Sequence, residues 1–495
     1  MLTNSDAGLR KYPCMSMFSG MSSLPFMILA SRGFRSNELA EMHKKHPILR
    51  TGPKTLSYGD TQAIKDIYGH GTKCTKDGSY SVTAGSHFHL ADVVDKPDHA
   101  RKRKVLSSAY ALKNLESWEF KVTDKAERLL AHFDRVCSQP PAPGTTRFRP
   151  DELDVDLRGW TNFFTLEAIA DIGLSTRLGF LDRGNDVCTA KRMDGTTYNV
   201  NLRPALYPNA HKQSLILWNY DWYPTLDKLV NVFPFFRRMD ETGSAWGDIM
   251  WNLSTERVKR YEAGEHLEDF FQALLEDKNG RPNNLEIGEM VAEVNIMMNA
   301  GSVTTAIAIA NVMYQLIKNP ECMEKLRKEV DAVLDPEELV APYDKVKHLP
   351  YLRACLDESL RLFPPTSHGL PREVPPEGMN IMGQWVPGGT SVSMSALVAH
   401  RDEKVFPEST KYIPERWLGE EGKALHPYFV AFSAGARSCI GRNISYLEQT
   451  KLIATLVHRY DFALSHPDWE LKRLETMNLI LGDMPVKVWR RHVDV

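Results

Sequence analysis

One apolar stretch, residues 285–318, limits what this chain can fold into more than any other part of the sequence. Apolar residues run from Leu285 to Lys318 almost without a break. Asn319 and Pro320 end the pattern, because proline disfavours helical geometry in the residue before it. As a helix the stretch would be about 50 Å long, at about 1.5 Å of rise per residue. A helix that is apolar on most faces must lie inside the protein, so the stretch predicts a large helical domain around a central helix.

Shorter patterns predict that a small β-rich part accompanies the helices. Residues 46–69 read as two short strands and a helix, and residues 349–363 read as a second helix that ends at a Pro-Pro pair. Residues 378–399 have an alternating, strand-like pattern on both sides of Pro387–Gly389, which predicts a small hairpin. Residues 185–240 give no clear assignment. We therefore expect a mainly α single domain with a minor sheet.

Charge and cysteine usage exclude several classes of protein. Lys and Arg number 61 against 63 Asp and Glu, so the net charge of −2 offers no basic excess for a nucleic-acid backbone. The seven cysteines are scattered singly with no C-x-x-C, which argues against a zinc site and indicates reduced thiols. No nucleic-acid partner is expected.

No secretory signal is expected at the N-terminus, because the first residues are polar. Residues 14–31 are uncharged, but they are rich in serine and contain Gly20 and Pro25. A membrane span needs about 20 predominantly apolar residues. This stretch is a poor candidate for a span and a better one for peripheral contact with a membrane surface.

The stretch F-S-A-G-A-R-S-C-I-G, residues 432–441, groups two glycines, an arginine and a cysteine just before a helical pattern. A helix start favours the thiolate form of Cys439. Gly435 and Gly441 permit unusual backbone angles and the approach of a flat ligand, and Arg437 offers a forked donor to a carboxylate. A small core side chain is the default for a single cysteine. The grouping favours instead a thiolate ligand to a haem iron.

These residues match F-x-x-G-x-R-x-C-x-G, and on them the chain resembles the cytochrome P-450 superfamily of haem-thiolate monooxygenases. The resemblance implies haem b with its iron bound by Cys439. It implies that Phe432, Gly435, Arg437 and Gly441 also bind the cofactor. It further implies a single large α-rich domain with a small β-rich subdomain and a long central helix.

Two further stretches agree with this family in type and order. Glu358 and Arg361, in E-S-L-R, share one helix face because they are three residues apart. Residues 414–417, P-E-R-W, resemble the P-E-R-F/W element, in which the arginine, here Arg416, joins the pair. On its own, an E-x-x-R pair usually lies on a solvated helix face. Because this pair, the P-E-R-W element and the cysteine loop follow one another in the family's order, the resemblance implies a structural ion-pair cluster that fixes the segment before the cysteine loop.

The long helix carries A-G-S-V-T-T, which resembles the family's A-G-x-[D/E]-T-[T/S]. The resemblance implies that Ala300 and Gly301 lie beside the iron, where the glycine thins the helix, and that Thr304 hydrogen-bonds the oxygen ligand. A mid-helix glycine costs about 1 kcal/mol of helix propensity, which indicates a local purpose. Val303 stands where the family has an acid, so proton delivery is left to water, Ser302 or the substrate.

Three basic residues resemble the family's haem-propionate partners. His99 and Arg103 fit its H-x-x-x-R pair, and Arg372 falls in G-L-P-R, where the family places another partner. The alternative for the first two is a solvated basic run, H-A-R-K-R-K.

The resemblance covers nearly the whole chain and is closest to the fungal microsomal branch, such as benzoate para-hydroxylases and pisatin-demethylase-like enzymes. It implies an N-terminal segment, residues 1–35, from which the branch's membrane anchor is missing, and a haem-thiolate catalytic domain, residues 36–495. The implied location is the cytoplasmic side of the endoplasmic reticulum, as a peripheral protein.

The activity that the resemblance implies is oxidation of a small to medium organic substrate by O₂, in fungal secondary or aromatic metabolism. The sequence has no flavin- or NADPH-binding pattern, so electrons are expected from NADPH through a separate reductase. A monomer is expected. Two alternatives stay open: oxidative coupling, desaturation or rearrangement without net oxygen insertion, motivated by Val303, and a haem-binding protein without turnover.

Overall fold

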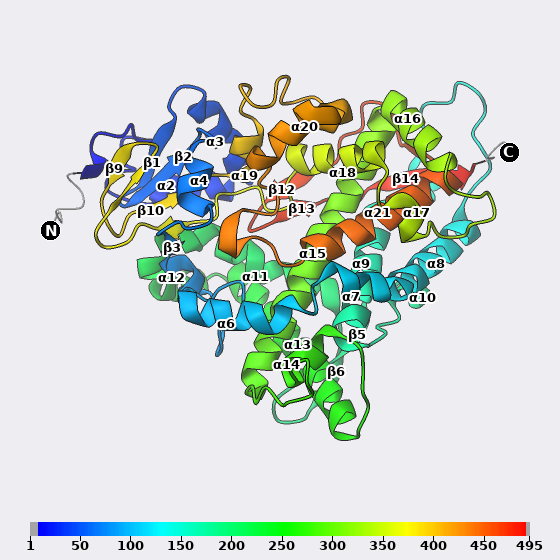
Figure 1. Ribbon diagram of the computed structural model, residues 1–495, viewed down its shortest axis with the longest axis horizontal. Helices are drawn as coiled ribbons and strands as arrows, with labels where there is room; N and C mark the ends of the chain where they lie inside the picture. The colour runs from blue at the N-terminus through cyan, green and yellow to red at the C-terminus, as the bar shows by residue number, and fades with distance from the viewer. Residues whose placement is uncertain (1–7, 492–495) are drawn as a thin grey trace.

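The computed structural model describes residues 8–491, and helices make up most of it (Figure 1). A smaller β-rich part lies at one end, as the sequence predicts. The first seven residues of the predicted N-terminal segment and the last four of the predicted catalytic domain lie outside the described residues.

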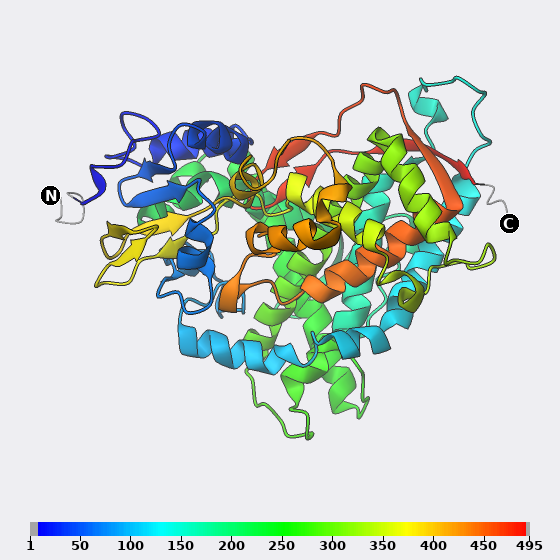
Figure 2. The same cartoon turned by 45° about the horizontal axis from the view of Figure 1, so that its top comes forward.

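The central helix, α15, spans Ile287–Lys318, within two residues of its predicted start. It packs against α9 (Leu157–Leu174), α18 (Pro350–Leu362) and α21 (Arg442–Arg459), and the turned view shows it in the middle of the molecule (Figure 2). By length and composition it is the one helix within residues 8–491 that could cross a membrane, but 72% of its most apolar window is buried. It is therefore a core helix. Residues 14–31 form only one short helix, α2 (Leu24–Ser31).

The remaining helices surround this core. Those before α15 are α3 (Arg35–His43), α4 (Ala63–Tyr68), α5 (Gly78–Val82), α6 (Lys96–Ser107), α7 (Leu112–Ser117), α8 (Glu119–Val136), α10 (Phe180–Arg183), α11 (Leu202–Ile216), α12 (Tyr223–Val230), α13 (Pro234–Glu262) and α14 (Phe270–Leu275). Those after it are α16 (Pro320–Asp331), α17 (Tyr343–Val346), α19 (Ala396–His400) and α20 (Gly419–Leu425). Five 3-10 turns join them: η1 (Pro150–Glu152), η2 (Leu217–Trp222), η3 (Pro414–Trp417), η4 (His426–Tyr428) and η5 (Gly435–Arg437).

The largest sheet combines strands that are far apart in the sequence. Its order is β1 (Ile48–Gly52), β2 (Thr55–Tyr58), β10 (Ser391–Ser393), β7 (Arg372–Glu373) and β3 (Thr75–Lys76). β2 runs antiparallel to β1 and parallel to β10, so the blue N-terminal strands lie beside the yellow ones in Figure 1. The smaller sheets pair β11 (Tyr460–Leu464), β14 (Pro485–Arg490) and β4 (Val155–Asp156); β12 (Arg473–Glu475) and β13 (Leu479–Leu481); β5 (Val187–Lys191) and β6 (Thr197–Asn201); and β8 (Met379–Ile381) and β9 (Gln384–Val386).

The hairpin predicted around Pro387–Gly389 turns elsewhere. β8 and β9 are joined at Met382 and Gly383, whose φ angles of 52° and 72° make the tight turn. Residues 387–389 instead lead from β9 into β10 of the large sheet. Proline and glycine there signal a change of direction, and composition alone does not tell a hairpin turn from a crossover.

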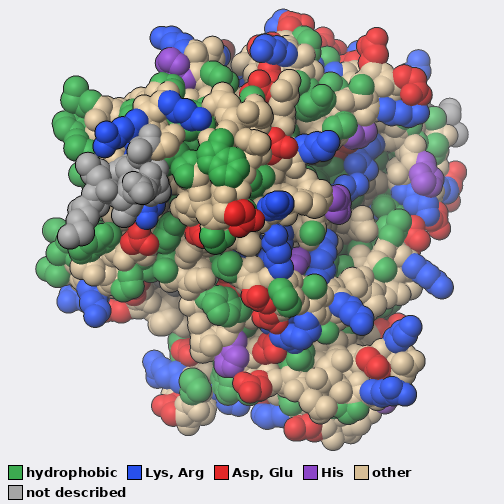
Figure 3. All heavy atoms as spheres, turned by 60° about the vertical axis from the view of Figure 1, so that its left-hand side comes forward, with side chains coloured by type: hydrophobic (Ala, Val, Ile, Leu, Met, Phe, Trp, Pro, Cys, Tyr) green, Lys and Arg blue, Asp and Glu red, His purple; other side chains and the backbone are tan. Residues whose placement is uncertain are grey.

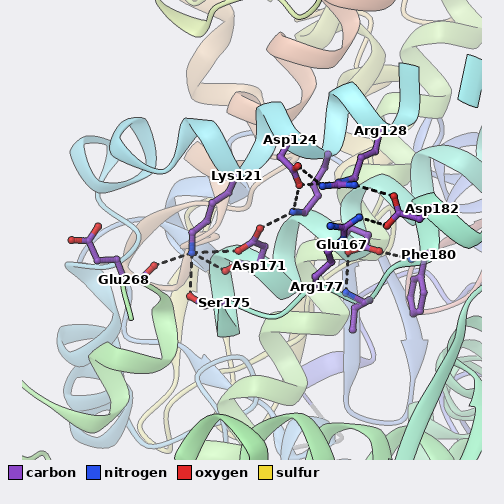
Figure 4. A network of polar contacts seen from close by, with 12 residues as sticks. Lys121, Asp124, Arg128, Glu167, Asp171, Ser175, Arg177, Phe180, Asp182 and Glu268 are labelled. Carbon is purple, nitrogen blue, oxygen red and sulfur yellow. Dashed lines mark hydrogen bonds and ion pairs between the residues drawn. The ribbon is translucent and has the colours of Figure 1, made fainter. Parts of the chain in front are cut away.

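A network of charged groups joins α8 to α9 (Figure 4). Lys125 Nζ lies 2.7 Å from Asp171 Oδ2, and Lys121 Nζ donates to the Asp171 carbonyl at 2.9 Å. Glu167 of α9 accepts the backbone N–H groups of Leu178 and Phe180. Because both lysines and Glu167 are buried, these bonds hold the register of α9, which packs directly on α15.

Candidate active site

A cavity of about 390 Å³ lies between α15 and the loop that precedes α21. Ala300, Gly301 and Thr304 line it from α15, and Phe432, Arg437 and Cys439 line it from the loop. Tyr110, Phe270, Phe271, Leu274 and Met297 add an apolar wall. Segments that are more than 120 positions apart thus meet around one space.

The Cys439 loop is held by its own backbone. The N–H of Cys439 donates to the carbonyl of Phe432 at 2.9 Å, which closes the loop over the 3-10 turn η5. The N–H of Gly441 donates to the sulfur. Helix α21 begins three residues after the cysteine, at Arg442. The sulfur therefore points to the cavity from a fixed position at a helix start.

Two opposing effects act on the pKa of the Cys439 thiol. Burial raises the pKa of Cys439, and the Gly441 N–H, Arg103 and Arg442 only oppose that rise. Desolvation disfavours the charged thiolate, and these partners do not fully offset it. The groups at the helix start therefore lower the pKa as expected, but burial outweighs them.

The two glycines of the loop have different roles. Gly435 has φ of +67°, and a Cβ there would lie 2.1 Å from the carbonyl oxygen of Tyr68, so any side chain would clash with backbone. Gly441 has φ of −82°, and a Cβ there would meet its nearest neighbours at 3.6 Å or more. The prediction of an unusual backbone angle is confirmed at Gly435 and wrong at Gly441.

On α15, Gly301 serves helix packing. A Cβ there would lie 2.7 Å from Cγ1 of Ile169 on α9, so the missing side chain is what lets the two helices approach. Thr304 Oγ1 donates to the carbonyl of Ala300 at 2.8 Å. This bond uses the hydroxyl proton and leaves the oxygen's lone pairs toward the cavity.

Neither Ser302 nor Val303 is among the residues that line the cavity. Ser302 Oγ is fully buried and donates to the carbonyl of Met298 at 2.7 Å. The option that protons pass through the Ser302 hydroxyl is therefore contradicted. On α15 and α21, the hydroxyl-bearing residues that line the cavity are Thr304, Thr305 and Ser445, and Thr305 Oγ1 donates to Ser445 Oγ at 3.0 Å.

Basic side chains gather around the same cavity. His99, Arg103, Arg372 and Arg437 line it, as does Lys76, which sequence reasoning missed. His99, Arg372 and Lys76 are at most 6% exposed, so the alternative of a solvated basic run is wrong for His99. Burial, with the neighbouring cations, lowers the pKa of His99 to about 3 and that of Lys76 to about 6.

Backbone carbonyls and a phenol orient the three arginines. Arg437 donates to the carbonyls of Val93 and Val94 at 2.7 and 2.9 Å. Arg103 donates to the carbonyl of Ser438 at 2.8 Å, which ties α6 to the cysteine loop. Arg372 lies 3.2 Å from the hydroxyl of Tyr80. None of these four contacts has a carboxylate as the acceptor.

This donor set fits haem b. Among the described residues that line the cavity, Glu293 is the one acid, against Lys76, His99, Arg103, Arg372 and Arg437. The three arginines stay charged and exceed the one acid, an arrangement that suits anionic groups, and haem carries two propionates. A cysteine sulfur that faces the same space matches an axial iron ligand.

Glu358, Arg361 and Arg416 meet beneath the cysteine loop. Arg361 donates to both carboxylate oxygens of Glu358 at 2.8 and 2.9 Å, and both side chains are fully buried. Arg416 Nε reaches Glu358 Oε1 at 3.1 Å, and Trp417 Nε1 reaches Oε2 at 2.9 Å. One carboxylate therefore joins α18 to η3.

His400, which sequence reasoning missed, connects this cluster to the cysteine loop. Its Nδ1 pairs with the carbonyl of Arg361 at 3.0 Å, and its Nε2 accepts the N–H of Val430 at 3.0 Å. Its ring stacks on Phe429 with the centroids 5.4 Å apart. Val430 is two residues before Phe432, so the ion-pair cluster fixes where the loop begins.

Comparison with known proteins agrees with this geometry. The Cytochrome P-450 family model matches residues 27–489. The chain is 29% identical to the cytochrome P-450 monooxygenase efuB of Hormonema carpetanum, over 90% of this chain and 85% of that protein. It is 30% identical to cicH of Emericella nidulans, a cytochrome P-450 monooxygenase, over 87% of this chain and 84% of that protein. It is 26% identical to the benzoate 4-monooxygenase bphA of Aspergillus niger, over 92% of this chain and 88% of that protein.

Proposed function

This chain belongs to the cytochrome P-450 family of haem-thiolate monooxygenases, and on that premise we propose that it hydroxylates a small to medium-sized organic substrate with O₂. A separate NADPH-dependent reductase supplies the electrons. One oxygen atom enters a C–H bond of the substrate, and the other leaves as water after two electrons and two protons are taken up.

One observation carries this proposal: Cys439, Thr304 and the five basic side chains line a single cavity of about 390 Å³. Cys439 is the proposed iron ligand, and His99, Arg103, Arg372 and Arg437 are the proposed propionate partners, joined by Lys76. When bound, the haem supplies the activation of O₂. The protein supplies position, charge balance and the exclusion of water.

Thr304 is the proposed polar group on the oxygen side. Its hydroxyl proton is committed to the carbonyl of Ala300, so its oxygen is free to accept a hydrogen bond from water or from a protonated group in the cavity. Thr305 and Ser445 also line the cavity, and Thr305 Oγ1 donates to Ser445 Oγ. These hydroxyls are the proposed proton carriers in place of an acid at position 303.

The wall composition favours an apolar, ring-bearing body of the substrate. Phe270, Phe271, Tyr110 and Met297 line the cavity together with Ile169, and aromatic side chains pack well against planar rings. A relative from Aspergillus niger is named for the oxidation of benzoate. We place the present substrate among aromatic compounds on these two grounds.

Labelled oxygen tests the reaction. The haem-loaded protein is mixed with a fungal NADPH-dependent reductase and a library of small aromatic compounds under ¹⁸O₂, and products are analysed by mass spectrometry. We expect a product with one ¹⁸O atom. An unlabelled dehydrogenated or coupled product would favour the alternative without oxygen insertion, and NADPH consumption that no compound stimulates would favour a haem protein without turnover.

We also propose that the protein lies on a membrane surface, with the N-terminal region and the α12–α13 connection in contact with lipid. Helix α2 packs against η2, and η2 packs against α12. Exposed apolar side chains lie in the N-terminal region, at Met17 and Met21, and at and just after the α12–α13 connection, at Val232, Phe233 and Phe235. Figure 3 shows apolar side chains gathered along the left-hand edge of this face.

Flotation with phosphatidylcholine vesicles tests this surface. Changing both Phe233 and Phe235 to Ser should lower the vesicle partition coefficient at least about tenfold, because each buried aromatic side chain contributes about 1.5–3 kcal/mol. Met193→Ser, on the β5–β6 hairpin, is the matched control, since Met193 is 84% exposed. Equal flotation of all three proteins would contradict the proposal.

A further inference from the structure

A groove of about 540 Å³ lies in the N-terminal region, apart from the cavity that Cys439 lines. Helix α2, the turn before it and α3 form its walls, and among the described residues none lines both spaces. The volume is in the range of small-molecule sites, about 300–1,000 Å³. Most of the lining residues are apolar: Met15, Phe18, Met21, Leu24, Pro25, Ile28, Leu29 and Met42.

Helix α2 is apolar around its whole circumference, because its sequence is L-P-F-M-I-L-A before the final serine. Leu29 packs inward with Leu39 and Val398 in a small cluster of buried residues. Leu24 and Ile28, one turn apart, line the groove and are 56% and 49% exposed. A helix that is apolar on all faces belongs in an apolar environment, so the face with Leu24 and Ile28 favours an apolar ligand.

The other walls of the groove favour a flexible chain over a rigid ring. Met15 and Met21 line it from the turn, and Met42 lines it from α3. Methionine side chains are unbranched and adapt to irregular shapes. Met21 and Phe18 are 72% and 55% exposed, so the groove is open along one side. An acyl chain laid along it would cover these side chains.

Two opposite charges also line the groove, and they belong to Arg32 and Glu38. Arg32 Nη1 lies 3.5 Å from Glu38 Oε2, and the two side chains are 61% and 37% exposed. This separation is longer than the roughly 2.7–2.9 Å of a charge-assisted hydrogen bond. An exposed pair of this kind contributes little stability, so both groups can turn to a ligand at small cost.

A zwitterionic phospholipid head group is the complement of this pair. Its phosphate matches the guanidinium fork of Arg32, and its ammonium group matches the carboxylate of Glu38. A fatty acid or an anionic phospholipid would bring no cation to Glu38, and an amphiphilic amine would bring no anion to Arg32. Charge and shape together select an acyl chain whose head group carries both charges.

We propose that this groove binds one acyl chain of a zwitterionic phospholipid, with the phosphate at Arg32 and the ammonium group at Glu38. The site goes beyond the proposed oxidation, because lipid binding needs no haem chemistry. It also differs from the proposed membrane surface, because a single lipid molecule in solution is sufficient to fill it.

Calorimetric titration of the haem-loaded protein with soluble lipid monomers tests the groove. An azole ligand in excess keeps the probes out of the catalytic cavity. The probes are lauroyl lysophosphatidylcholine, lauroyl lysophosphatidylglycerol and dodecyltrimethylammonium, each below its critical micelle concentration. Lysophosphatidylcholine should bind about fivefold more tightly than either other probe, which corresponds to about 1 kcal/mol. One exposed ion pair gained and one like-charge contact avoided account for this difference.

Two charge variants should change this preference in different ways. Arg32→Gln removes the partner of the phosphate, so dodecyltrimethylammonium should bind as tightly as lysophosphatidylcholine. Glu38→Gln removes the partner of the ammonium group, so lysophosphatidylglycerol should bind as tightly. Arg149→Gln is the matched control, because Arg149 pairs with Asp151 at 3.3 Å and the two side chains are 73% and 70% exposed. It should leave the preference unchanged.

A change in the apolar wall should act on all three probes alike. Leu24→Ser should weaken the binding of each about tenfold, because less apolar surface is buried. Leu112→Ser is the control, since Leu112 is likewise the first residue of a helix and is 43% exposed. Circular dichroism and haem content show whether each variant is folded. If Leu24→Ser does not fold, the two charge variants decide.

The lipid site would be overturned by the absence of binding below the micellar concentration, or by equal affinity of the wild type for all three probes. A preference that survives both Arg32→Gln and Glu38→Gln would overturn it as well. The double change of Phe233 and Phe235 to Ser should not alter the titration, so lost flotation with retained lipid binding would count against the membrane surface alone. Lipid binding without oxidation of any compound would count against the proposed reaction alone.

Discussion

Replacing Cys439 by Ala should yield a folded protein that no longer holds its haem as a thiolate complex. The sulfur opens onto the cavity and adds little to the core, so the urea midpoint of the protein without haem should stay close to that of the wild type. Haem affinity should fall more than about 100-fold, since loss of a residue that only orients a metal ligand already costs about 10–100-fold. In whatever complex remains, reduction under carbon monoxide should give no red-shifted, thiolate-type Soret band.

Cys14→Ala is the matched control, because Cys14 is also a free, exposed cysteine and does not line the cavity. It should leave both haem content and spectrum unchanged. A thiolate-type Soret band that persists in Cys439→Ala would contradict the assignment of the iron ligand, and all that follows from it for the cavity.

Features set by neighbours in the sequence could be predicted from it. The cysteine loop is one example, because its ten residues form their own 3-10 turn and the bond from Cys439 N–H to the Phe432 carbonyl. The Glu358–Arg361 pair is another, since three residues of spacing place both on one helix face. The long apolar run similarly placed α15 within two residues of its actual start.

Features set by distant segments could not be predicted in the same way. Lys76 enters the cavity because β3 pairs with β7, and the ring of His368 packs against Trp218, which is 150 positions earlier. Residues 185–240 contain a hairpin, three helical segments and the start of α13; β5 and α11 pack against α13, and α11 and η2 pack against α2. The hydrophobic periodicity and the composition of a segment do not show which distant segments it contacts.

Local chemistry gives only part of the role of a small side chain. Gly301 lines the cavity and also lets α9 approach, because Ile169 packs against it. Ser302 donates to its own helix, and burial at Cys439 opposes the effect of the helix start. Packing and desolvation decide such cases, and both are properties of the folded chain.

Changing Glu358 to Gln should destabilise the protein more than any substitution on its surface. The neutral amide leaves the guanidinium groups of Arg361 and Arg416 without their carboxylate, and these side chains are 0% and 9% exposed. Breaking a buried ion pair by removing one partner costs about 3–5 kcal/mol. Because domains are stable by only about 5–15 kcal/mol, we expect a large loss of soluble, haem-loaded protein and a much lower urea midpoint.

Glu420→Gln separates this effect from a general loss of negative charge. Glu420 pairs with Lys423 at 2.7 Å, but the two side chains are 87% and 69% exposed, so the change should cost no more than about 1 kcal/mol. The cluster also reaches the cysteine loop through His400, which binds the Arg361 carbonyl and the Val430 N–H. Glu358→Gln protein that does fold should therefore also show faster hydrogen exchange in residues 428–441. A urea midpoint and exchange rates equal to those of Glu420→Gln would show that the buried cluster does not hold the loop.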